Sequence, residues 1–142
     1  MKPNLPARIL FAASLVVAIG ACRRSTEPDP LVGTFVASTF LITPNGQGTL
    51  NVLAQGGVLG INIATTSGSF TTAGTLILPP ALATQTVTIN LMGTASRTDN
   101  LVRFVPSVPS FLSELTFTLG VNTLTTNQTV ADTTYDIVLT RY

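Results

Sequence analysis

Apolar side chains alternate with threonine or other polar side chains along several segments of this chain. Segments 86–91, 114–119 and 132–141 show the pattern most clearly, and in the last of them Ile137 and Leu139 alternate with Asp136 and Val138. Successive residues of a β-strand point to opposite faces of a sheet, whereas no stretch of ten or more residues has helical apolar spacing. We therefore predict an all-β domain whose strands each have one buried and one solvated face, which suits an antiparallel barrel or sandwich.

Turn residues divide the domain into eight or nine expected strands. Residues that tolerate positive φ at 44–48 and Gly56-Gly57 predict hairpin loops, Pro79-Pro80 ends a strand, and 105–113 is a break with room for one helical turn. Some of the short pieces within 58–78 can belong to one bent strand. The expected strands are 31–42, 48–55, 58–65, 68–72, 75–78, 86–95, 100–105, 114–120 and 132–141. The fold class predicted is a small antiparallel up-and-down barrel of about eight strands, with a β-sandwich as the alternative.

The first 21 residues have the pattern of a secretory signal peptide. Lys2 and Arg8 precede an apolar run over 9–21, and Cys22 follows directly. A membrane-spanning helix needs about 20 apolar residues, so this run is too short to cross a bilayer. Segment 22–30 is charged and contains two prolines, so we interpret it as a flexible tether. The folded domain is then 31–142.

The cleavage region Ile19-Gly20-Ala21-Cys22 resembles the lipobox of bacterial lipoproteins. The resemblance implies that Cys22 becomes the N-terminus and carries lipid, palmitate included, which would anchor the protein to a membrane of the bacterial cell envelope. Arg23 stands where an inner-membrane retention signal has Asp, which implies the outer membrane. The alternative is an ordinary signal peptide followed by an incidental cysteine.

The two ends of the domain resemble those of small lipocalin-like domains of bacterial lipoproteins. Gly33-Thr34-Phe35 matches the Gly-x-aromatic motif that opens the first strand, and Arg141 matches the basic residue that closes the last. The resemblance implies a calycin-type barrel in which Arg141 packs on Phe35 where the barrel ends meet. The usual tryptophan is replaced here by Phe35.

The composition excludes most site chemistry. Only 9% of residues are charged and there is no His, so a nucleophile has no base beside it, and we expect neither an enzyme nor a metal or cofactor. After residues 1–21 are removed, five Arg and no Lys face six acidic residues, which argues against nucleic acid as a partner. Asp99, Glu114, Asp132 and Asp136 are expected at turns or on polar faces, and Arg97 is expected to form a surface ion pair with Asp99.

Two functions remain open. The first is a binding module with a pocket for a small apolar ligand, although the interior can equally be filled by side chains. The second is a structural or protein-interaction module of the envelope, enzyme inhibition included. It rests on Leu82, Val108, Phe111 and Leu112 in the loops 79–85 and 106–113, which can instead plug one barrel end. The candidate pocket residues are Leu50, Val52, Ile61, Ile63, Phe70, Ile89, Leu91, Phe104, Phe117 and Ile137.

Overall fold

The computed structural model of the chain describes residues 27–142. The predicted signal peptide 1–21, the predicted lipidation site Cys22 and the first part of the predicted tether lie outside the described residues.

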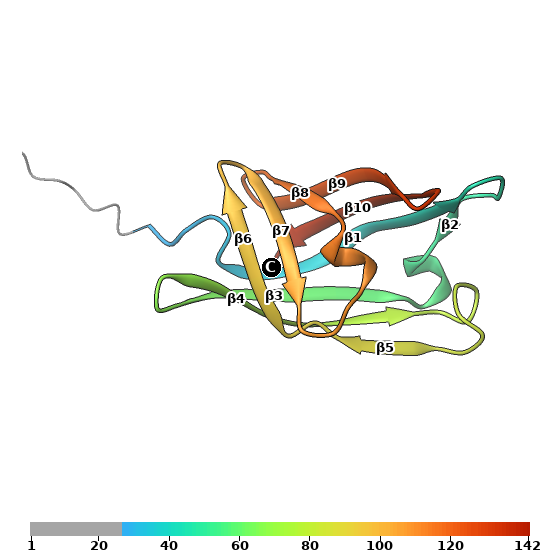
Figure 1. Ribbon diagram of the computed structural model, residues 1–142, viewed down its shortest axis with the longest axis horizontal. Coiled ribbons are helices and arrows are strands. Elements are labelled where there is room, and N and C mark those ends of the chain that lie inside the picture. Colours follow the sequence, from blue (N-terminus) through green and yellow to red (C-terminus); the bar gives the residue numbers. More distant parts are fainter. Residues whose placement is uncertain (1–26) are drawn as a thin grey trace, which may run out of the picture.

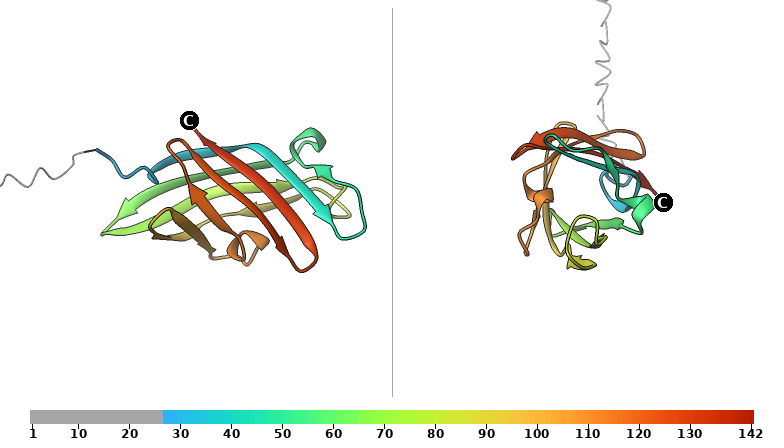
Figure 2. Two further views of the ribbon diagram at one scale, coloured as in Figure 1. Left: turned by 90° about the horizontal axis from the view of Figure 1, so that it is seen from above. Right: turned by 90° about the vertical axis from the view of Figure 1, so that its right-hand side faces the viewer.

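Eight antiparallel strands form a closed barrel (Figure 1). Around the ring, each strand pairs with the next in the order β10-β9-β8-β7-β6-β4-β3-β1, and β1 pairs with β10 to close it. Figure 2 shows the ring along its axis. The closure confirms the predicted all-β barrel and excludes the sandwich. The strands of the ring are β1 Gly33–Pro44, β3 Val58–Thr66, β4 Ser69–Leu78, β6 Gly93–Thr98, β7 Leu101–Pro106, β8 Thr116–Leu119, β9 Thr123–Val130 and β10 Thr133–Arg141.

Two short strands and two helical turns complete the described part of the chain. The strand β2 (Leu50–Asn51) pairs with β1, and β5 (Val87–Asn90) pairs with β4. The 3-10 turn η1 spans Leu53–Gln55, and η2 spans Phe111–Ser113, at the end of the segment where one helical turn was expected. Within residues 27–142, no helix has the length and apolar character needed to cross a membrane.

Tight two-residue turns join three pairs of neighbouring strands. Ser67 and Gly68 have φ values of 51° and 81°, and Ala131 and Asp132 have φ values of 45° and 63°. Asp99, between β6 and β7, also has a positive φ of 56°. Such turns match the right-handed twist of the strands that they connect. In the predicted turn at 44–48, the N–H of Gln47 donates to the carbonyl of Pro44.

The expected strand 48–55 and the hairpin loop at Gly56-Gly57 are wrong. Only β2 is extended there, because Val52 turns into the interior, where it is fully buried and donates its N–H to the carbonyl of Phe40. Gly56 has a φ of 85° and ends the turn η1, with its N–H donating to Leu53. The glycine pair therefore closes a helical turn that leads into β3 instead of joining two strands.

The expected strand 86–95 is divided in two, whereas 68–72 and 75–78 are one strand. β4 is long enough to pair with β6 through 70–72 and with β5 through 75–78. Leu91 and Met92 lie between these two partners. At Gly74 a Cβ would meet the carbonyl oxygen of Gly60, so a glycine lets the backbones of β3 and β4 approach closely here.

The strand β9 was not expected from the sequence. Its residues are mostly threonine, asparagine and glutamine, and its only apolar residues are Leu124 and Val130. It forms nonetheless because it pairs with β10 at eight consecutive positions. Tertiary pairing has here overridden a weak apolar pattern.

A single cluster of buried apolar side chains fills the barrel. The alternation predicted for the last strand is confirmed, since Ile137 and Leu139 are fully buried and Val138 is only half-buried. The largest fully buried side chains come from six of the eight ring strands, from η2 and from the segments that precede β1 and β8; they are Phe35, Phe40, Phe117, Leu31, Leu59, Ile61, Ile63, Leu76, Leu112, Leu115, Leu124 and Ile137.

Candidate functional site

Gly33, Phe35 and Arg141 meet at the end of the barrel where the described chain enters. Phe35 and Arg141 are opposite each other in the β1–β10 register, and the Arg141 guanidinium lies 5.3 Å from the centre of the fully buried Phe35 ring. Gly33 has a φ of +149°, and a Cβ there would lie 3.1 Å from Arg141 Nε. The glycine therefore provides both the backbone conformation and the space that the arginine needs.

The segment before β1 is fastened over the same end. Arg141 donates hydrogen bonds to the carbonyls of Pro30 and Val32, the latter at 2.8 Å. Asp29 forms an ion pair with Arg97 at 2.7 Å and accepts a hydrogen bond from the N–H of Leu31. The side chain of Leu31 is fully buried. Arg97 thus pairs with Asp29, and the expected ion pair with Asp99 is wrong, because Arg97 Nε reaches only the main-chain carbonyl of Asp99.

The candidate pocket residues pack against one another. Phe70 and Ile89 are partly buried against the core, whereas Leu50 is half-buried and lies outside the core cluster. A cavity bordered by Ile61, Leu91 and other core residues measures about 10 Å³. That volume is at the lower limit for a single water molecule. The fully or almost fully buried candidates are Val52, Ile61, Ile63, Leu91, Phe104, Phe117 and Ile137.

Three of the four apolar loop residues cover the opposite end of the barrel. Leu112 is buried, and Leu82 and Phe111 pack against the core, whereas Val108 remains 51% exposed. The ring of Phe111 stacks on Tyr135, with centroids 4.7 Å apart and planes 8° apart. A shallow apolar depression of about 220 Å³ lies over this plug.

The plug also changes the acidity of Tyr135. Burial raises the pKa of this phenol above its ordinary value of 10.0, and the negative charge of Glu114 raises it further. Both effects favour the neutral side chain. Tyr135 therefore contributes an uncharged aromatic surface to the depression at physiological pH.

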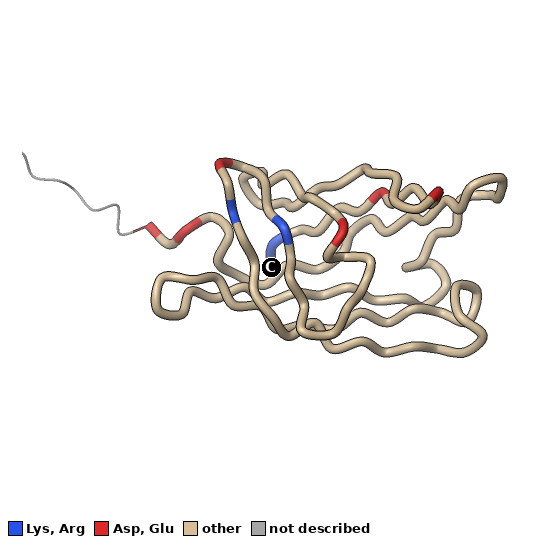
Figure 3. Tube along the Cα trace, viewed as in Figure 1, with Lys and Arg blue, Asp and Glu red and all other residues tan. Residues whose placement is uncertain are grey.

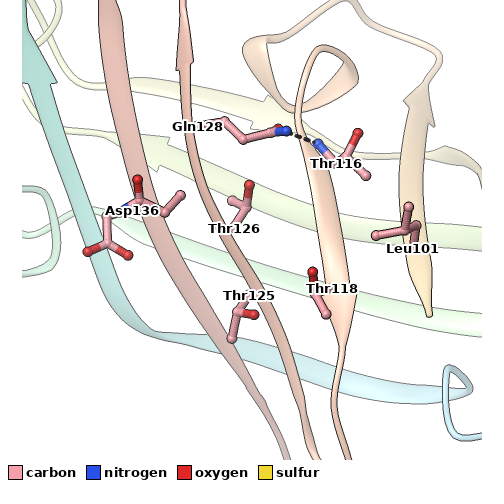
Figure 4. A pocket seen from close by; sticks show the side chains of 8 residues that line it. Leu101, Thr116, Thr118, Thr125, Thr126, Gln128 and Asp136 are labelled. Carbon is pink, nitrogen blue, oxygen red and sulfur yellow. Dashed lines mark hydrogen bonds between the residues drawn. The ribbon is translucent and has the colours of Figure 1, made fainter.

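A polar groove of about 460 Å³ lies on the outside of the barrel between β8 and β9 (Figure 4). Side chains of four threonines form much of its wall, and the Thr116 N–H donates a 2.7 Å hydrogen bond to Gln128 Oε1 across it. Thr126 is 6% exposed, and its Oγ1 has no hydrogen-bond partner among the described residues. The groove is lined by Leu101, Thr116, Thr118, Thr125, Thr126, Asn127, Gln128 and Asp136.

Charged side chains are sparse on the described part of the barrel. Its cations are Arg97, Arg103 and Arg141. Figure 3 shows the cationic positions in the half of the barrel where the described chain enters, whereas acidic positions are spread toward both ends. Asp136 lines the polar groove, and Asp132 lies in the hairpin turn between β9 and β10. Within residues 27–142, no three acidic residues come together as a metal site would require.

Comparisons of the chain with protein-family models, with curated proteins and with solved structures return no match. The closed eight-stranded antiparallel barrel is compatible with a calycin-like fold. Sequence reasoning did not find the polar groove, because Thr126 and Gln128 belong to the strand that it missed. The only feature of the sequence that could have indicated the groove is a run of threonine, asparagine and glutamine residues with few apolar residues among them.

Proposed function

We propose that this protein is a lipid-anchored module of the bacterial cell envelope that acts through its outer surface and not as a carrier of apolar molecules. The observation that carries this proposal is the filled barrel. The cavity among the candidate pocket residues measures about 10 Å³, whereas the groove on the outside measures about 460 Å³. Small-molecule sites commonly have volumes of about 300–1,000 Å³. The module performs no catalysis.

The anchoring part of the proposal is supported by the lipobox-like sequence ending at Cys22. Several acyl chains together hold a protein stably on a membrane. The resemblance to lipoproteins favours the outer membrane, since Arg23 stands where an inner-membrane retention signal has Asp. The ion pair of Asp29 with Arg97 and the hydrogen bond from Arg141 to the carbonyl of Val32 hold the segment before β1 at one end of the barrel. An anchored barrel would therefore present the plugged end, with Phe111 and Tyr135, away from the membrane.

Two measurements on the full-length protein, expressed in a bacterium and purified in detergent, test the proposal. Mass spectrometry of the N-terminal peptide is expected to find diacylglyceryl and acyl groups on Cys22, and a C22S variant is expected to lack them. Native mass spectrometry is expected to give the mass of the lipidated chain alone. An unmodified Cys22 would overturn the anchoring, and a stoichiometric apolar molecule within the folded barrel would overturn the filled-core module.

A second candidate function is binding of a small apolar molecule at the plugged end. The stacked Phe111 and Tyr135 rings and the half-buried Leu82 favour it, since they line or border the depression of about 220 Å³. A Phe111→Ala variant would then lose saturable binding of a fluorescent naphthalene sulfonate, whereas Val108→Ala, on the exposed part of the same loop, would keep it.

A further inference from the structure

The two most exposed large apolar side chains of the described residues lie side by side. Tyr142 is 92% exposed and Val121 is 86% exposed, whereas the other exposed large apolar side chains within residues 27–142 are between 43% and 58% exposed. The N–H of Arg141 donates to the carbonyl of Asn122, which continues the β9–β10 pairing by one step. The next step of this pairing places Val121 beside Tyr142. We call these two residues the apolar rim.

The apolar rim lies at the end of the barrel where the described chain enters. Arg141, which precedes Tyr142, donates hydrogen bonds to the carbonyls of Pro30 and Val32 in the segment before β1. Figure 2 shows the C-terminus and the turn between β8 and β9 toward this end. The plug covers the opposite end. The rim is therefore on the side of the barrel from which the tether leaves.

The tether limits the distance between this end and a lipid on Cys22. Asp29, which is held on the barrel by Arg97, follows Cys22 by seven residues (29 − 22 = 7). An extended chain spans about 3.6 Å per residue, so the two residues are at most about 25 Å apart. A linker this short keeps the barrel end at a high local concentration over the membrane, so even a weak contact is populated.

Charge is a poor driving force for such a contact. The described residues at this end include two arginines, Arg97 and Arg141, and three acidic residues, Glu27, Asp29 and Asp99. The two arginines of the tether change the sum only from −1 to +1. Attraction to anionic headgroups is therefore weak, and a contact with the membrane has to come from apolar side chains.

Tyrosine and valine supply those side chains. Tyrosine is enriched at the boundary between membrane and water, because its ring is apolar and its hydroxyl is polar. Both side chains of the rim are almost completely exposed, so they are available to a lipid surface.

We propose that the apolar rim rests on the membrane that holds the anchor, with Tyr142 and Val121 at the boundary between headgroups and hydrocarbon. The proposal deepens the proposed function and rests on its lipid anchor at Cys22. The contact holds the barrel in one orientation, with the turn between β8 and β9 against the membrane and the plug away from it.

The fluorescence of an introduced indole tests this contact, since the chain has no tryptophan. The full-length lipidated Tyr142→Trp variant is reconstituted into phosphatidylcholine vesicles with or without bromine atoms on the acyl chains, because bromine quenches an indole only at close range. Its emission is expected to fall about twofold or more in the brominated vesicles, as for an aromatic ring at the interface. Val121→Trp is the second reporter, with the same expected result, and it replaces Tyr142→Trp if that variant does not fold.

Two control variants carry the same indole at other exposed positions. Thr66→Trp lies beside the turn between β3 and β4, at the same end of the barrel, and Val108→Trp lies in the loop of the plug. Both are expected to be quenched much less than Tyr142→Trp. Equal quenching of Thr66→Trp would show that the tether alone brings this end to the bilayer, and equal quenching of Val108→Trp would show that the barrel has no fixed orientation. Either result overturns the proposal.

A second substitution tests the apolar nature of the contact. Val121→Ser in the Tyr142→Trp protein is expected to restore about half of the lost emission, since it removes one of the two apolar groups. Val58→Ser, which changes an exposed valine at the start of β3, is the matched control and should restore none. Addition of anionic phosphatidylglycerol is expected to leave the quenching unchanged. Quenching that appears only with this lipid would overturn the apolar contact.

Flotation of the same vesicles separates failure of this contact from failure of the anchor. A protein that is lipidated on Cys22 and floats with the vesicles, but whose Tyr142→Trp indole is not quenched, would overturn the membrane contact and leave the anchor intact. An unmodified Cys22 in a protein that does not float would overturn both.

Discussion

Arg141 lies directly over Gly33, so that a methyl group on Gly33 would come within 3.1 Å of the arginine Nε. The first and last strands of the barrel meet at this contact, and the same guanidinium covers the buried ring of Phe35. It also holds the carbonyls of Pro30 and Val32. One side chain therefore joins the two ends of the ring and the segment that enters it.

Replacing Arg141 by alanine is expected to lower the free energy of unfolding by about 2 kcal/mol, because the cation–ring contact and the hydrogen bonds to main-chain carbonyls are lost. Phe35→Ala is expected to cost about 4 kcal/mol through the cavity that it leaves. Urea denaturation measures both changes. Arg103→Ala is the matched control and should change stability by less than about 0.5 kcal/mol. An Arg141→Ala variant as stable as this control would contradict the packed pair.

A Gly33→Ala substitution is expected to destabilise the protein by about 2 kcal/mol, since alanine is strained at a φ of +149° and its methyl group would press on Arg141. In the Arg141→Ala background the steric part disappears, so the cost of Gly33→Ala should fall. Thermal unfolding of the two single variants and the double variant measures the difference. Additive losses would show that the methyl group and the guanidinium do not interact.

The segment before β1 is expected to stabilise the barrel through Leu31. Leu31→Ala should lower the free energy of unfolding by about 3 kcal/mol, because its side chain is fully buried. Asp29→Ala should cost less than about 1.5 kcal/mol, since its ion pair with Arg97 is partly solvated. Denaturant titration compares both with the exposed control Glu27→Ala. Equal stabilities for Leu31→Ala and the control would mean that this segment does not close the barrel end.

Leu112→Ala is expected to open a cavity beside the existing space of about 10 Å³ and to cost about 3 kcal/mol. Apolar cavities of this kind stay dry and take up small apolar molecules such as benzene. NMR titration with benzene should therefore show binding to this variant and none to the unchanged protein. Val108→Ala changes an exposed residue of the same loop and should behave like the unchanged protein.

Tyr135 should make stability depend on pH at the alkaline end. Its pKa is raised in the folded state by burial and by Glu114, so the neutral phenol is favoured by folding. This contribution is complete below the unfolded pKa of 10.0 and is lost as the pH rises through the higher folded pKa. Melting temperatures from about pH 8 to about pH 12 should fall less steeply for Tyr135→Phe than for the unchanged protein.

A spectroscopic titration of the same phenol gives an independent measurement. The chain has two tyrosines, so a Tyr142→Phe variant reports the ionisation of Tyr135 alone by its absorbance near 295 nm. Its midpoint is expected above that of Tyr135 in the urea-unfolded variant. A folded midpoint at or below the unfolded one would contradict the burial of this side chain by the plug.

The sequence alone was enough to predict the class of fold. The alternation around Ile137 and Leu139 placed an apolar face on β10, and alternation of this kind depends only on the geometry of a single strand. Residues that tolerate positive φ predicted the hairpin loop at 44–48, where Gly46 has a φ of 71°. The resemblance to lipocalin-like domains predicted that Arg141 packs on Phe35, and the two side chains are in contact in the structure.

Tertiary structure decided everything that depends on pairing between distant segments. β9 exists because β10 pairs with it, although its threonines and amides give a weak strand pattern. The division at Leu91 arises because β4 is long enough for two partners. The strand expected over 48–55 ends early because Val52 packs in the core and its N–H donates to the carbonyl of Phe40. The groove over Thr126 follows from a ladder that stops after two pairs. The sequence of each strand determines which of its faces is apolar. Barrel closure, strand register and surface grooves depend instead on the pairing of strands that are far apart in the sequence.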